Sequence, residues 1–282
     1  MDAGLKIGDF ELTWLNGGTF ELDGGAMFGV VPKVLWQKKY PPSEDNYIPL
    51  SAWPLLVRTP QALVLIESGI GNKLTDKQKK IYRIKQEWSI LEDLKKLNIA
   101  REDINYVILT HYDFDHAGGV VMQDDGGNLS LTFPKADHII QKKEWEDVLM
   151  PNIRSVNTYW PVNIELMKDN GRLHLVNGTT DIVPGISVVH TGGHNGGHQI
   201  VTMTSQGEKA LHLGDLLPTH AHANPLWVMA YDNFPMESIS LKEHWIKQGI
   251  ADGVWFTFYH DTFMTACKYD NKGNIAEQWP KG

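Results

Sequence analysis

The stretch YVILTHYDFDHAGG, residues 106–119, decides how the rest of the chain is interpreted. It opens on a short apolar run of the kind expected for a β-strand buried on both faces. Two imidazoles and two carboxylates follow within six residues, from His111, Asp113, Asp115 and His116, before a Gly-Gly pair. Divalent metals of borderline hardness prefer such a mixture of nitrogen and oxygen ligands. The stretch therefore predicts a metal-binding loop at the end of a strand.

Three later strand ends carry similar side chains. His194 lies in the glycine-rich run HTGGHNGGH, residues 190–198, Asp215 follows an apolar run, and His260 ends the last clear strand. One such residue after a strand is usually a hydrogen-bonded structural residue. Four strand ends of this kind in one chain favour a shared metal site. His198, at the end of the same glycine-rich run, is expected to be a structural hydrogen-bonding residue rather than a ligand.

Strand-like and helix-like segments alternate along the chain without a long linker or a clear repeat. This pattern predicts one layered α/β domain over residues 1–282. Apolar spacing at Ile84, Trp88, Leu91, Leu94 and Leu97 predicts a helix within residues 75–97. The other expected strands cover residues 62–66, 137–141, 185–191, 199–204, 209–214 and 254–259, and the other expected helices cover 142–149, 162–168 and 236–249.

Composition narrows the class of protein. The chain has 282 residues, 42% of them hydrophobic, with 26 basic against 34 acidic side chains, so the charge expected of a nucleic-acid binder is absent. Its one cysteine, Cys267, can form neither an internal disulfide nor a cysteine-rich zinc site. Neither a signal-peptide run nor an apolar stretch of membrane-spanning length is present. We therefore expect a cytoplasmic protein with neither nucleic acid nor membrane as partner.

The order of these motifs resembles that of the metallo-β-lactamase-fold hydrolases. Their signature is His-x-His-x-Asp-His, then a histidine in Gly-His-x-x-Gly-His, then an aspartate and a late histidine. The flanking sequences resemble the YtnP-like quorum-quenching lactonases, in the runs DFELTWLNGG (9–18), GAMFGVVPK (25–33), PTHAH (218–222) and WFTFYHD (255–261). The resemblance covers nearly the whole chain. It implies a four-layer αββα sandwich with two divalent metal ions, zinc first among them, at the strand ends.

Carried over position by position, the resemblance implies a ligand set and a reaction. The first metal would be held by His111, Asp113 and His194, the second by Asp115, His116 and His260, and Asp215 would bridge them. A hydroxide between the metals would open the ring of a lactone, such as an N-acyl homoserine lactone or a related signal. Asp115 would orient this nucleophile and pass its proton to the leaving alkoxide.

Other residues are assigned supporting roles. Some related lactonases carry a tyrosine three residues after the bridging aspartate, where this chain has Pro218. His220 is the expected catalytic substitute, and Met27, Phe28 and His222 are expected to contact the substrate. Asp261 is expected to fix the ring of His260. The resemblance also suggests a homodimer. The apolar residues 26–40 are expected first to form core and a loop, and a subunit contact or a pocket wall is the alternative.

Asp113 departs from the family pattern, which has histidine there. With Asp113 the two metals, three carboxylates and one hydroxide would be neutral overall, one unit less positive than the histidine form. We expect less acidic metals, a bound water of higher pKa, and a shift of preference toward manganese or iron. Asp113 is read in three ways, as a working ligand, as a weak ligand of the first metal, or as the mark of a poorly active site.

Three alternatives to a lactonase stay open from the sequence. A phosphotriester or phosphodiester hydrolase could use the same ligands. A weakly active metal-bearing protein could bind a signal molecule without turning it over, and Asp113 is the feature that supports this possibility. Redox chemistry at an iron pair is the third alternative.

Overall fold

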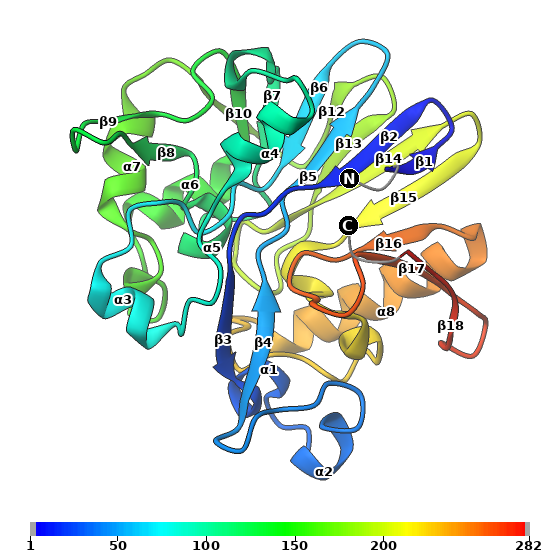
Figure 1. Cartoon of the computed structure of the whole chain (residues 1–282). Coiled ribbons are helices and arrows are strands. Elements are labelled where there is room, and N and C mark those ends of the chain that lie inside the picture. The colour runs from blue at the N-terminus through cyan, green and yellow to red at the C-terminus, as the bar shows by residue number, and fades with distance from the viewer. Residues whose placement is uncertain (1–3, 280–282) are drawn as a thin grey trace.

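The computed structural model of the chain describes residues 4–279 and contains two seven-stranded sheets packed face to face (Figure 1). The first sheet runs in the order β1 (Leu5–Ile7), β2 (Phe10–Trp14), β5 (Leu55–Arg58), β6 (Leu63–Ile66), β7 (Tyr106–Ile108), β10 (Asp137–Gln141) and β11 (Leu173–Val176). The second runs in the order β12 (Thr179–Val183), β13 (Ile186–His190), β14 (Gln199–Ser205), β15 (Glu208–His212), β16 (Trp255–Thr257), β17 (Ala266–Tyr269) and β18 (Ile275–Trp279).

Apolar side chains from both sheets form the central core. Val57 and Ile66 of the first sheet belong to the same buried cluster as Val188 and Val201 of the second. Strand β7 lies between β6 and β10 and runs parallel to both, which explains its continuous apolar sequence. The sequence-based strands at 62–66 and 137–141, and those of the second sheet, are confirmed to within a few residues.

Helices cover the outer face of each sheet, which completes the expected four-layer αββα sandwich. Helices α4 (Ile90–Lys96), α6 (Lys142–Leu149) and α7 (Pro161–Lys168) pack on the first sheet through one buried cluster. Helix α8 (Pro235–Asp252) packs on the second sheet through Ile246, beside Leu211 and Phe256. Within residues 4–279, no helix combines the length and the apolar character needed to cross a membrane.

A smaller ribbon extends from the sandwich. Strands β3 (Thr19–Asp23) and β4 (Tyr47–Ser51) pair with each other, and the short helices α1 (Gly24–Phe28) and α2 (Lys33–Trp36) lie near their far end (Figure 1). Residues 26–40 contribute Met27, Phe28, Trp36 and Tyr40 to a separate buried cluster. The remaining α-helices and strands are α3 (Asp76–Ile81), α5 (Phe114–Ala117), β8 (Val121–Gln123) and β9 (Leu129–Leu131).

The helix predicted within residues 75–97 is wrong as a continuous element. The chain forms α3 and α4, with an irregular stretch between them. Residue Arg83 has a positive φ of 48°, and the backbone N–H groups of Thr19 and Lys85 bond to the carbonyls of Gln86 and Thr19. The apolar spacing arises because Trp88, between the helices, packs on the core and donates to the Ser68 carbonyl. These contacts with the start of β3 override the local helical preference.

Candidate metal centre

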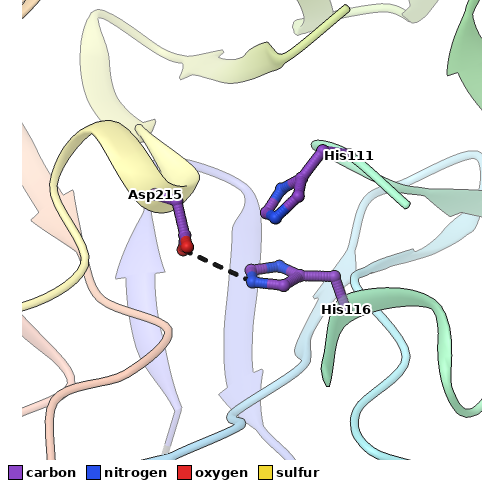
Figure 2. A group of neighbouring side chains, drawn as sticks. All are labelled: His111, His116 and Asp215. Atoms are coloured by element: carbon purple, nitrogen blue, oxygen red, sulfur yellow. Dashed lines mark ion pairs between the residues drawn. The ribbon is translucent and has the colours of Figure 1, made fainter. Parts of the chain in front are cut away.

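The expected ligands come together at one edge of the sandwich. His111 follows β7, Asp113 precedes α5, and Asp115 and His116 lie on α5. The second sheet supplies His194 from the turn between β13 and β14, Asp215 from the turn after β15, and His260 from the turn after β16. Figure 2 shows the side chains of His111, His116 and Asp215 pointing toward one another. The candidate ligand atoms fall into three overlapping groups, each within 4.8 Å: His111, His116 and Asp215; His111, Asp113 and His194; Asp115, His116 and His260.

Asp215 lies between the two expected ligand sets. Its Oδ2 is 3.5 Å from His194 Nε2, while its Oδ1 is 3.3 Å from His116 Nε2 and 3.2 Å from His260 Nε2. One oxygen thus faces a member of the first set and the other faces two members of the second. This is the placement that a bridging carboxylate requires.

Asp113 occupies the position at which the family has histidine. Its Oδ2 lies 3.4 Å from His111 Nε2 and 3.5 Å from His194 Nε2. Its other carboxylate oxygen is buried and has no hydrogen-bond partner. The carboxylate therefore points at the two imidazole nitrogens with which it would share a metal, as the working-ligand interpretation requires.

Three of the four candidate ligand histidines are held by hydrogen bonds at Nδ1, and the Nδ1 of the fourth, His116, faces a carboxylate without forming a hydrogen bond. His111 Nδ1 is 2.9 Å from Thr110 Oγ1, and His260 Nδ1 donates to the Ser51 carbonyl at 2.7 Å. His116 Nδ1 lies 3.2 Å from Glu67 Oε1, and His194 Nδ1 lies 2.8 Å from Asp232 Oδ1. Each ring consequently turns its Nε2 toward the shared space, which is the orientation of a metal-ligating histidine with a fixed tautomer.

The donor set fits a cation. The Nε2 atoms of His111 and His194 and the Oδ1 atom of Asp215 are buried without a hydrogen-bond partner. Buried polar atoms ordinarily have partners, so several unpartnered atoms that converge on one space indicate a missing positive ligand. Each of the two expected ligand sets, counted together with the shared Asp215, has two imidazoles and two carboxylates. Such a mixture of nitrogen and oxygen donors suits divalent zinc, manganese or iron.

The electrostatics of the cluster favour positive charge. Burial acts against ionisation, yet the imidazoles of His116, His260 and His194 hold the pKa of Asp215 well below its ordinary value. Burial would likewise raise the pKa of Asp113, but the neighbouring imidazoles of His111 and His194 hold it below its ordinary range. The pKa of His116 and of His194 is raised well above the usual value, because the charge of nearby carboxylates, Asp215 first, outweighs the effect of burial.

Two carboxylates beside the site were missed in the sequence. Glu67 is fully buried and accepts from Thr110 Oγ1 at 2.5 Å as well as facing His116. Its position directly after an apolar strand was an available signal, because the other ligands also follow strands. Asp232 lies in an irregular stretch just before α8 and belongs to no motif, so only the fold brings it to His194.

A cavity of about 180 Å³ opens onto the candidate ligands Asp113, Asp115, His194, Asp215 and His260. Its apolar wall contains Leu22, Met27, Leu50, Phe114 and Met229, and its remaining lining contains Tyr82, Arg154, Ser155, Thr158, Asn195, Tyr231 and Asn233. Met27 is therefore placed where a substrate contact was expected. Burial raises the pKa of Tyr82 and of Tyr231 to about 12, so both hydroxyl groups are protonated at neutral pH.

The substrate contacts expected of Phe28 and His222 are corrected by the structure. Phe28 is fully buried and stacks between Trp36 and His222, at ring-centroid distances of 4.8 and 4.4 Å. His222 is also fully buried, with Nδ1 2.8 Å from Thr219 Oγ1 and Nε2 2.9 Å from the Met27 carbonyl. Neither lines the cavity at the ligands. They support the backbone behind Met27 instead.

The catalytic role expected of His220 is also corrected. His220 lines a different cavity, together with Lys39, Tyr269 and Lys272, and its Nδ1 is 2.5 Å from Asp261 Oδ2. Asp261 was expected to fix the ring of His260 but binds His220 instead, because its carboxylate points away from the cluster. The ring of His260 is fixed by the Ser51 carbonyl. His198 bonds Thr191 Oγ1 through Nδ1 and stands outside the three candidate ligand groups.

Comparisons with known proteins place this geometry in a family. The sequence model described as "Metallo-beta-lactamase superfamily" matches residues 47–251. A solved structure from Staphylococcus aureus, described as a "probable metal-dependent hydrolase", is 45% identical, with a TM-score of 0.93 and coverage of 98% of this chain and 99% of that one. The dizinc quorum-quenching lactonase AidC, solved with the product it describes as N-hexnoyl-L-homoserine, shares the fold at 20% identity, with a TM-score of 0.79 and coverage of 99% and 98%.

Curated relatives are more distant. An N-acyl homoserine lactonase from Bacillus sp is 24% identical over 167 residues, which make up 56% of this chain and 60% of the relative. The chain thus spans about 60% of the length of this lactonase.

Proposed function

Because this chain belongs to the metallo-beta-lactamase superfamily, we propose that it is a metal-dependent hydrolase that opens the ring of a small lactone, of the N-acyl homoserine lactone kind. The observation that carries the proposal is the convergence of four imidazoles and three carboxylates at the floor of one cavity. The distant lactonase relatives support the choice of substrate class.

The distances between the candidate ligand atoms support the proposed ligand assignment. His111, Asp113 and His194 would hold one divalent ion, Asp115, His116 and His260 a second, and Asp215 would bridge them. Ions bound there would lower the pKa of a water molecule and polarise the ester carbonyl. Zinc is the first candidate ion. The extra oxygen ligand of Asp113 would shift the metal preference toward manganese or iron.

The chain's own residues would perform the remaining steps. Asp115 faces the cavity, with Oδ2 3.6 Å from His260 Nε2, so its carboxylate can accept the proton of the attacking water and return it to the leaving alkoxide. The hydroxyl of Tyr231 or Tyr82 can donate to the substrate carbonyl, a role left open by Pro218. Leu22, Met27 and Met229 offer an apolar wall for an acyl chain.

The ring-opening activity can be tested on protein purified without chelators or affinity metals. We expect about two ions per chain by elemental analysis and proton release in a pH-stat with N-acyl homoserine lactones. An Asp115→Asn variant should lose most of this rate, whereas Asp125→Asn, which removes an exposed carboxylate, should keep it. Hydrolysis of a phosphotriester with no lactone hydrolysis would move the assignment to phosphoester chemistry. Metal binding with neither activity would favour a binding protein.

The proposed assembly is a homodimer. Val30, Val34 and Leu35 on residues 26–40 are exposed by 90%, 63% and 48%, which is unusual for branched apolar side chains so close together. Burial of this surface against a second copy would remove it from water. A sedimentation mass of one chain at micromolar concentration would contradict the dimer, and Val30→Lys should shift a dimer toward the monomer.

A further inference from the structure

One wall of the cavity is attached directly to a candidate metal ligand. Residues 229–234, here called the wall segment, line the cavity through Met229, Tyr231 and Asn233. Between them, Asp232 turns the other way and is only 4% exposed. Its Oδ1 accepts the hydrogen bond of His194 Nδ1 at 2.8 Å. Adjacent residues of one short segment therefore contact the substrate space and a ligand.

The backbone strengthens this attachment. The N–H of Asn233 donates to the His194 carbonyl at 2.8 Å, and the N–H of Phe234 donates to the Gly193 carbonyl at 2.9 Å. The side-chain amide of Asn233 donates to Asn195 Oδ1 at 2.8 Å. Three consecutive residues thus hold the turn that carries His194. At its other end, the segment is fixed by the N–H of Ala230, which donates to the Ala26 carbonyl at 2.8 Å.

Asp232 has a defined effect on His194. A carboxylate that accepts from Nδ1 fixes the imidazole tautomer with a lone pair on Nε2, and it makes that nitrogen a better ligand. His194 Nε2 points at Asp113 Oδ2 and Asp215 Oδ2, each 3.5 Å away. The position of Asp232 consequently determines where the ligand nitrogen of His194 lies.

We propose that Asp232 couples metal binding at His194 to the shape of the cavity wall. The inference rests on the metal centre of the proposed function and goes beyond it. An ion held by His194 fixes the ring, the ring fixes Asp232, and Asp232 fixes the wall segment. Coupling between two sites is reciprocal, so a ligand that steadies the wall segment also strengthens metal binding. Asp232 is a positioning residue, because it acts through His194.

The first test measures metal binding without any substrate. Asp232→Ala should weaken one of the two ions about 10- to 100-fold in a competition titration with a zinc chelator, the range found for removal of a ligand's supporting partner. Asp232→Asn keeps an acceptor for Nδ1 and should fall between Asp232→Ala and the unchanged protein. Asp125→Asn makes the same charge change at an exposed position and should bind normally. When the proteins are loaded with cobalt, the visible absorption of one of the two ions should differ from that of the unchanged protein in the Asp232 variants but not in Asp125→Asn.

The second test measures the wall segment itself by hydrogen exchange. Metal loading of the unchanged protein should slow exchange of the amides of Asn233 and Phe234, and this slowing should be lost in Asp232→Ala. If exchange there is the same with and without ions, or if both Asp232 variants bind two ions normally, the coupling is refuted. If Asp232→Ala fails to fold, the metal affinity of Asp232→Asn and the hydrogen exchange of the unchanged protein still test the coupling. Neither test uses a lactone, so bound ions without lactonase activity would refute the proposed substrate and leave the coupling intact.

Discussion

A single substitution at Asp113 can decide whether this residue is a working metal ligand or a defective one. Asp113→Asn keeps the shape and one oxygen of the side chain and removes its negative charge. The carboxylate lies 3.4 and 3.5 Å from the two ring nitrogens with which it would share an ion. A unit-charge interaction across about 4 Å is worth about 4 kcal/mol at the effective dielectric of protein sites. A divalent ion at a ligand distance of about 2 Å interacts more strongly than this, so the first ion should lose at least about a thousandfold in affinity.

The assay is a competition titration with a chelator of known affinity, read together with the metal content of the purified variants. Asp113→Asn should hold about one ion per chain under conditions in which the unchanged protein holds two. The control Asp125→Asn should hold both. If Asp113→Asn holds both ions with unchanged affinity, Asp113 is no ligand and the assignment of the first site fails.

Asp113→His adds a further arm to this experiment by restoring the residue of the family pattern. A large gain in lactone turnover would show that the native centre is attenuated. A measurable native rate without gain would show that Asp113 works as a ligand in its own right.

Three other substitutions test the packing and the corrected assignments. Phe28→Ala should lower the free energy of unfolding by about 3–5 kcal/mol in a urea titration, since Phe28 is a fully buried ring, and should leave the metal content unchanged. The control is Phe263→Ala, because 49% of that residue is exposed. A similar loss of stability in the control would contradict this reasoning. His220→Gln should alter neither metal content nor hydrolysis by more than about twofold, and a loss of ions would return His220 to the metal centre. Burial lowers the pKa of Lys242 from 10.5 to about 7, so the cost of its charge is fully present below pH 7 and fades as the pH rises toward 10.5. At pH 6, urea titration should therefore give Lys242→Met a free energy of unfolding a few kcal/mol higher than that of the unchanged protein. This difference should shrink by pH 9.5. A difference that does not depend on pH would refute the lowered pKa of Lys242.

The segments that carry the candidate ligands were predictable because each of them follows an apolar strand. Strand ends of a layered sandwich meet at one edge, so local sequence indicated the four segments, and the family resemblance then singled out His111, His194, Asp215 and His260 within them. The strands themselves were predictable for the same reason, since buried strands such as β7 consist of continuous apolar residues.

Interactions set by the fold alone could not be predicted. The wall segment reaches His194 through an irregular path, so nothing local to Asp232 indicates its partner. Asp261 follows His260 directly, but successive side chains after a strand point in different directions, and its carboxylate binds His220. The helix within residues 75–97 failed because the backbone at Gln86 pairs with Thr19, a contact between distant parts of the sequence.

The origin of the ligands in both sheets has a consequence for how the chain holds together. His111 and His260 lie 149 positions apart, and an ion bound between their sets would join the two halves of the sandwich as a staple does. In the chain-entropy treatment of cross-links, a closed loop of that length is worth about 5 kcal/mol against the unfolded chain. Withdrawal of metal would then do more than stop a reaction. It would lower the free energy of unfolding and make the chain easier to proteolyse, so that the lifetime of the protein would depend on the supply of its ions.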